Sequence, residues 1–139
     1  TVPVAQAIAA NAHPLYIART LPSGRQITSN ALLGQLQPVV TGAALDGALT
    51  VLPPGGPAAP RHGRFVVDGR QLGGSSESVF ASLYREGRTH GLLEPDAGGG
   101  MMQLHFTVPA SRALPPGEYR VVLRVNGQQA VDAPALSWV

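Results

Sequence analysis

The chain has 139 residues, of which 44% are hydrophobic and only 13% charged, and this balance excludes a long disordered or highly charged protein. All ten basic residues are arginines dispersed along the chain, and eight acids bring the net charge to +2, so we expect no nucleic-acid partner. The lack of cysteine excludes disulfides and thiolate metal sites, and no apolar run reaches the roughly 20 residues of a membrane-spanning helix.

Residues 1–37 are predicted to form an N-terminal arm or hairpin. Leu15 to Thr20 favours a strand, Leu21 to Arg25 a turn, and Gln26 to Thr28 a short return strand. Val2 to Ala10 lacks a wide apolar stripe and is expected to make at most a helical turn. The apolar residues expected to contact a neighbouring subunit are Leu15, Tyr16, Ile17 and Ile27.

Residues 38–139 are predicted to form a β-sandwich. Its first two strands are expected at Gln37 to Val40 and Ala48 to Leu52, separated by the region from Gly42 to Gly47. The segment PPGGPAAP at 53–60 predicts a linker or a long rigid loop, because proline favours extended geometry and glycine permits sharp turns. A strand at Phe65 to Asp68 and a glycine-rich corner at Gly69 to Gly74 are expected next.

The following strands are predicted from apolar periodicity. Val79 to Tyr84 has apolar residues on both faces, as expected of a central strand, and Glu86-Gly87 turns the chain into a weaker strand at Thr89 to Leu93. Glu94 to Gly100 has the composition of a loop. Leu104, Phe106 and Val108 alternate with polar residues, which predicts a half-buried strand at Gln103 to Val108.

The last stretch, Leu114 to Val139, carries the strongest β signals. Alternation from Tyr119 to Val125 predicts a strand, Asn126-Gly127 is the preferred dipeptide of a type I′ hairpin turn, and Ala135 to Val139 is a final apolar run. Tyr119 is expected to send its hydroxyl back to the preceding corner. Trp138 is expected to fill the core, and the alternative is an exposed aromatic side chain that a partner covers. The residues with predicted structural roles are Tyr119, Gly117, Asn126, Gly127 and Trp138.

Strands at intervals of about ten residues, with no convincing helix, predict an all-β, immunoglobulin-like antiparallel β-sandwich with Greek-key connections and an extended N-terminal arm. No catalytic residue, cofactor or metal ligand is predicted. Ser75 and Ser76 lack a nucleophile motif, and Glu94 with Asp96 are too few acids for a calcium loop. The histidines have no zinc-ligand spacing: His13, His62, His90 and His105.

Three segments, Arg64 to Gly74, His105 to Ala110 and Leu114 to Gly127, resemble immunoglobulin-like IPT/TIG domains. More particularly, they resemble the C-terminal domain of tail-terminator (tube cap) proteins of contractile injection systems. That family's separate N-terminal α/β domain is not visible here. The start at Thr1, without an initiator methionine, predicts a processed chain or a fragment of a larger protein. The resemblance implies a detached appendage or a shortened relative of that family.

The resemblance implies a non-catalytic structural module of a phage-tail-like particle, assembled in the cytoplasm or released. Its partners would be other protein subunits in a homo- or hetero-oligomer. The alternative is a carbohydrate-binding accessory domain of a secreted or surface protein, contacting its ligand through aromatics such as Tyr84 or Tyr16.

Overall fold

The computed structural model describes residues 10–15, 18–28, 32–73 and 77–139. Strands dominate this part of the chain, and a single 3₁₀ turn, η1, is the one helical element in it, so the prediction of an all-β fold is confirmed. The elements are β1 Asn11–Leu15, β2 Ala18–Thr20, β3 Gln26–Thr28, β4 Leu32–Leu36, β5 Val39–Leu45, β6 Thr50–Val51, β7 Arg61–Arg70, β8 Val79–Arg85, β9 Arg88–Leu93, β10 Gln103–Val108, η1 Ala110–Arg112, β11 Gly117–Val125, β12 Gln128–Gln129 and β13 Ala135–Trp138.

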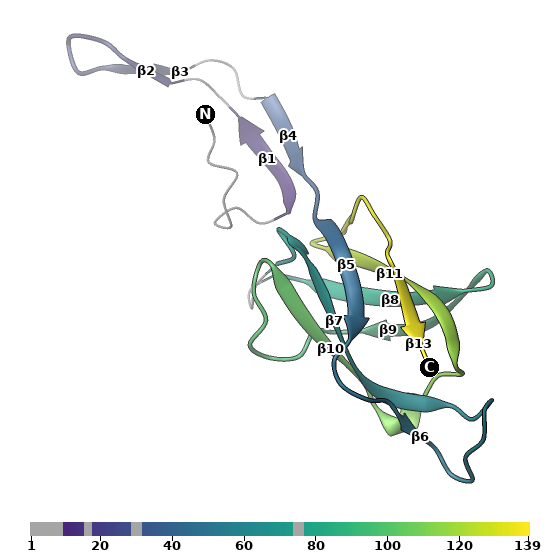
Figure 1. Cartoon of the computed structure of the whole chain (residues 1–139). Helices are drawn as coiled ribbons and strands as arrows, with labels where there is room; N and C mark the ends of the chain where they lie inside the picture. Colours follow the sequence, from purple (N-terminus) through teal and green to yellow (C-terminus); the bar gives the residue numbers. More distant parts are fainter. Residues whose placement is uncertain (1–9, 16–17, 29–31, 74–76) are drawn as a thin grey trace.

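Two antiparallel sheets form the sandwich (Figure 1). The first has the order β10-β7-β5, with the short β6 also pairing with β7. The second has the order β9-β8-β11, and both β12 and β13 pair with β11. On one side β13 lies beside β5 of the first sheet, and just outside these two strands the Val131 amide donates to the Pro38 carbonyl oxygen at 3.2 Å.

The core lies between the inner faces of the two sheets. Alternate residues are buried along much of β7, β8, β10 and β11, as the period-two pattern of β10 and β11 predicts. Phe65 on β7 stacks on Phe106 at 5.1 Å between ring centroids, and it meets Trp138 of the opposite sheet edge-on at 6.3 Å. These three rings therefore link the two layers.

Three strands of the sandwich differ from the sequence-based expectation: β5 and β7 are longer, and β6 covers only Thr50–Val51 of the strand predicted at Ala48 to Leu52. β5 continues through Gly42 to Leu45, so the predicted break after Val40 is wrong; a register shift between Val40 and Gly42 lets Ala43 and Leu45 pair with β7. β7 is ten residues long and not four. Pairing with a neighbouring strand overrides the weak β-propensity of glycine and alanine in β5 and of glycine in β7.

Both tight hairpins of the second sheet have the turn geometry that sequence favours. Asn126 and Gly127 have φ values of 50° and 79°, and Glu86 and Gly87 have 52° and 78°. Positive φ at both central residues is the requirement of a type I′ turn. The 53–60 segment, in which the Pro53-Pro54 bond is cis, forms the loop between β6 and β7.

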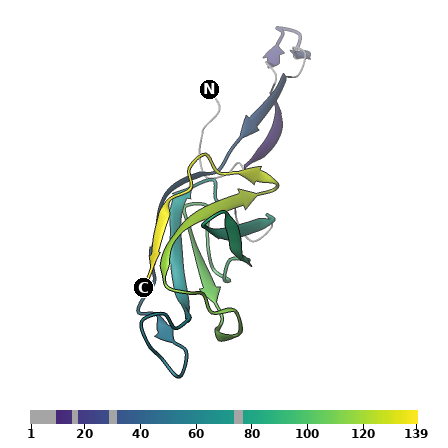
Figure 2. The same ribbon diagram turned by 90° about the vertical axis from the view of Figure 1, so that its right-hand side faces the viewer.

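The arm comprises two ribbons that project from the sandwich (Figures 1 and 2). β1 pairs with β4, from Asn11 opposite Leu36 to Leu15 opposite Leu32, and β2 pairs with β3 further out. The strand expected at Leu15 to Thr20 is therefore interrupted: Leu15 ends β1 and Ala18 begins β2, while residues 1–9, 16 and 17 lie outside the described residues. No helix in the described ranges is long and apolar enough to cross a membrane.

Candidate functional site

Tyr119 lies near the start of β11 and is fully buried against the corner that precedes this strand. Its hydroxyl donates to the Pro115 carbonyl oxygen at 2.7 Å. The Arg85 guanidinium lies 5.6 Å from the centroid of its ring and donates to the Pro116 carbonyl oxygen at 2.8 Å, and His90 packs edge-on at 5.5 Å. This arrangement fixes the corner and leaves Tyr119 no contact with solvent.

Gly117 and Trp138 face each other at the start of β11. The Trp138 indole Nε1 donates to the Arg61 carbonyl oxygen at 3.2 Å, so the one polar group of this buried side chain is satisfied. A Cβ at Gly117 would overlap the Arg85 guanidinium. Both residues serve packing and not a ligand.

Asn126 does more than form a turn. Its backbone amide donates to the Ser78 carbonyl oxygen at 2.8 Å, and its side-chain Oδ1 accepts from the Ser78 amide at 3.1 Å. Its Nδ2 donates to the carbonyl oxygen of Ala10, 3.2 Å away at the buried base of the arm. Asn126 therefore joins β8, the β11–β12 turn and the arm.

The residues considered for catalysis or metal binding are not brought together where the structure describes them. His90 packs on Tyr119, and His105 Nδ1 lies 3.2 Å from Asp46 Oδ2 on the outer face of the first sheet. Within the described ranges no three histidine, aspartate or glutamate side chains form a group that suits a metal ion. Ser75 and Ser76 lie outside these ranges, and of His13 only the backbone is described.

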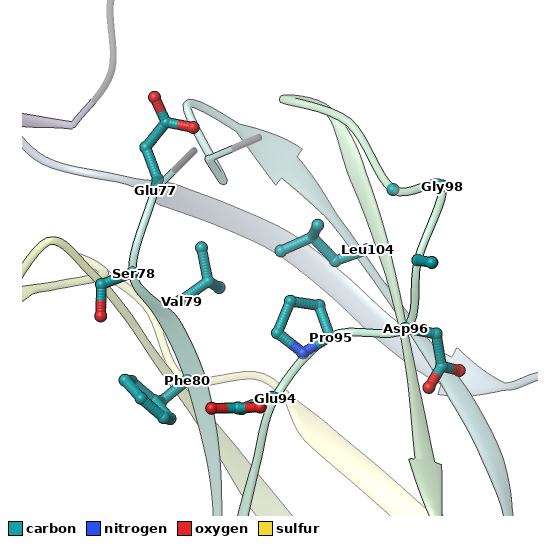
Figure 3. A pocket seen from close by; sticks show the side chains of 11 residues that line it. Glu77, Ser78, Val79, Phe80, Glu94, Pro95, Asp96, Gly98 and Leu104 are labelled. Atoms are coloured by element: carbon teal, nitrogen blue, oxygen red, sulfur yellow. The ribbon is translucent and has the colours of Figure 1, made fainter. Parts of the chain in front are cut away.

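Asp96 is held by the first sheet. Its Oδ2 accepts from the Thr107 hydroxyl at 2.7 Å and lies 3.6 Å from Arg64 Nε. Figure 3 shows its carboxylate turned away from Val79 and Phe80. This pairing leaves Glu94 as the carboxylate of the 94–100 loop that faces the hollow described next.

A hollow of about 380 Å³ lies between the start of β8 and the loop from β9 to β10. We call it the acidic groove. Val79, Pro95 and Leu104 lie inside it, and the carboxylates of Glu77 and Glu94 stand to either side of Val79 and Pro95 (Figure 3). The residues that line it are Glu77, Ser78, Val79, Phe80, Glu94, Pro95, Asp96, Ala97, Gly98, Gly99 and Leu104.

The acidic groove combines an apolar centre with carboxylates at its rim. Its centre is apolar, and its lining residues include no histidine, arginine or cysteine. A second hollow of about 360 Å³ shares Phe80 and Glu94 with it and extends along β9 toward Arg112. Together the two hollows follow the side of the sandwich on which β9 and β10 meet.

The outer end of the arm is exposed. We call residues Ala18 to Gln26 the arm tip; Leu21 and Arg25 bond through their backbones at its turn, with the Leu21 amide 2.8 Å from the Arg25 carbonyl oxygen. Of the predicted contact residues, Leu15 pairs with Leu32 and Ile27 with Arg19 through their backbones, but their side chains are not described. Tyr16 and Ile17 lie outside the described residues.

The sequence signals did not identify the acidic groove or the contact between Asn126 and Ala10. Both bring together residues far apart in the chain, and neither has a motif spacing. Comparison of the chain with protein-family models, with curated proteins and with solved structures finds no match.

Proposed function

We propose that this protein is a non-catalytic assembly module, a structural subunit of a contractile-injection or phage-tail-like particle, and that the arm contacts a neighbouring subunit. The observation that carries the proposal is the projection of β1–β4 and β2–β3 from the sandwich (Figures 1 and 2). A two-stranded ribbon with no third strand is marginally stable in water. Contacts with a neighbouring subunit would stabilise these two ribbons.

Composition supports the same proposal. Only 13% of the residues are charged, and the cores of protein interfaces are depleted of charge. The particle as the setting is supported by the resemblance of residues 64–127 to the immunoglobulin-like domain of tail-terminator proteins. The bond from Tyr119 to the Pro115 carbonyl oxygen is of the kind that tyrosine corners make in immunoglobulin-like sandwiches, which supports that kinship.

The experiment shortens the arm without disturbing the sandwich. Leu15 and Leu32 are register partners in β1 and β4, so residues 16–31 are replaced by Asn-Gly, which closes the ribbon with a type I′ turn. We expect the wild-type chain to form a large complex in sedimentation velocity, and the shortened chain to melt as the wild type does but to sediment as a monomer.

Two results would contradict the proposal. One is a shortened chain that still forms a complex as large as that of the wild type, and the other is a wild-type chain that is a monomer at every concentration. The second result favours the carbohydrate-binding alternative, for which Tyr84, 43% exposed on β8, is the candidate contact.

A further inference from the structure

We propose that the arm tip of one copy docks in the acidic groove of the next copy, so that the particle subunit assembles head to tail. This inference rests on the proposed function and names the surface that the arm contacts. It follows from the charge of the arm tip, the charge and polarity of the acidic groove, and the separation of the two within one chain.

The only charged residues of the arm tip are two arginines, Arg19 and Arg25. Arg19 and Arg25 are exposed on β2 and next to β3, and neither forms an ion pair with any residue that the structure describes. The first acidic residue of the sequence is Asp46, beyond the arm. The arm therefore has no acid of its own to neutralise the two arginines.

The acidic groove has the opposite charge. Glu94 is exposed, and no ion pair or hydrogen bond links its side chain to another described residue. Glu77 stands across Val79 and Pro95 from it (Figure 3). Guanidinium and carboxylate groups make charge-assisted hydrogen bonds, often bidentate, so two arginines suit this rim better than two lysines would.

The apolar parts of the two surfaces also correspond. Leu21 and Pro22 lie between Arg19 and Arg25 at the turn of the arm tip. Val79, Pro95 and Leu104 lie between or beside the carboxylates of the acidic groove. An apolar centre flanked by charge on both surfaces is the arrangement of a specific interface.

The geometry makes the contact intermolecular. β2 and β3 lie at the far end of the arm, away from the sandwich that carries the groove (Figures 1 and 2). A copy therefore presents the tip at one place and the groove at another. Repeated head to tail, such a heterologous contact builds rings or filaments.

Charge reversal in the full chain tests the proposal. The tip variant carries Arg19→Glu and Arg25→Glu, and the groove variant carries Glu77→Arg and Glu94→Arg. We expect each variant to be mainly monomeric in sedimentation velocity, with the dissociation constant raised about tenfold or more. If the groove variant fails to fold by circular dichroism, Glu94→Arg alone takes its place.

Mixing gives the sharper result. The Arg tip of the groove variant fits the Glu groove of the tip variant, and the Glu tip of the tip variant fits the Arg groove of the groove variant. An equal mixture should therefore form large complexes in which the two variants alternate. A chain with all four substitutions should assemble again. The controls are Arg88→Glu and Glu118→Arg, both exposed at the opposite end of the second sheet from Val79, and they should leave the mass unchanged.

The outcomes separate this inference from the proposed function. Loss of assembly on shortening the arm, together with normal assembly of both charge-reversal variants, would overturn the docking site and leave the assembly role standing. An equal mixture of the two variants that stays monomeric would also overturn the docking site. Assembly that survives shortening of the arm would overturn both.

Discussion

Replacing Asn126 by glycine tests whether one side chain ties the arm to the sandwich. Glycine keeps the positive φ of 50° without strain, so the type I′ turn survives, but both side-chain hydrogen bonds are lost. The Ser78 amide is in an exposed position and can bind water instead. The Ala10 carbonyl belongs to a fully buried residue and loses its partner.

The expected cost follows from this difference. A hydrogen bond whose freed group is solvated contributes about 0.5 to 1.5 kcal/mol, and a buried group left without a partner costs about 1 to 3 kcal/mol. Asn126→Gly should therefore lower the free energy of unfolding by about 2 kcal/mol. Asn126→Asp keeps an acceptor for the Ser78 amide but places a carboxylate oxygen against the Ala10 carbonyl, so it should cost at least as much.

Urea denaturation of the three proteins measures these costs, and hydrogen exchange at the Ser78 amide separates the two bonds. That amide should stay protected in wild type and in Asn126→Asp and exchange fast in Asn126→Gly. Wild-type stability of Asn126→Asp would refute the argument, because it would mean that no bond to Ala10 contributes.

Two further substitutions probe the packing of the sandwich. A Cβ at Gly69 would overlap the Val39 carbonyl oxygen, a backbone atom that cannot move alone, so Gly69→Ala should lower the free energy of unfolding by about 2 to 3 kcal/mol. Gly91→Ala, where the added Cβ meets no atom within 4 Å, is the matched control, and equal denaturation midpoints for the two variants would contradict this. Tyr119→Phe keeps the ring and loses only the hydroxyl that donates to the Pro115 carbonyl oxygen, so the free energy of unfolding should fall by about 1 kcal/mol in the same assay, and an unchanged midpoint would show that the bond contributes nothing.

The strands predicted most accurately from the sequence are those with one buried face. β10 was predicted with its observed bounds, and the alternation of β11 is seen in its burial pattern, because a half-buried strand requires a period of two. The Asn126-Gly127 turn was predictable because few dipeptides accept positive φ at both positions. In these elements local pattern and tertiary contacts agree.

Elements stabilised by pairing alone were harder to predict. The rest of β5 is rich in glycine and alanine, and its strand conformation follows from its register with β7. β1 contains Pro14, which disfavours a central strand, but β1 pairs only with β4 among the described strands and so has a free edge that tolerates proline. Neither strand has a signal within its own residues.

The acidic groove was not predictable for another reason. Residues 77–80 and 94–99 are brought together by the pairing of β8 with β9 and by the course of the loop that follows. No motif spacing in the sequence indicates that these two segments are close in space. The loop itself was recognised from its composition, but its partner across the hollow was not.

The position of Trp138 gives the protein a built-in optical probe. It is the only tryptophan in the chain, it is fully buried, and it contacts Phe65 and the Arg61 carbonyl of the opposite sheet. Its fluorescence should therefore be that of an indole shielded from water and should shift to longer wavelength when the sheets separate. Trp138 is the last residue of β13, and the arm projects from the sandwich away from the C-terminal end of that strand (Figure 1). The emission should therefore report the integrity of the sandwich independently of assembly.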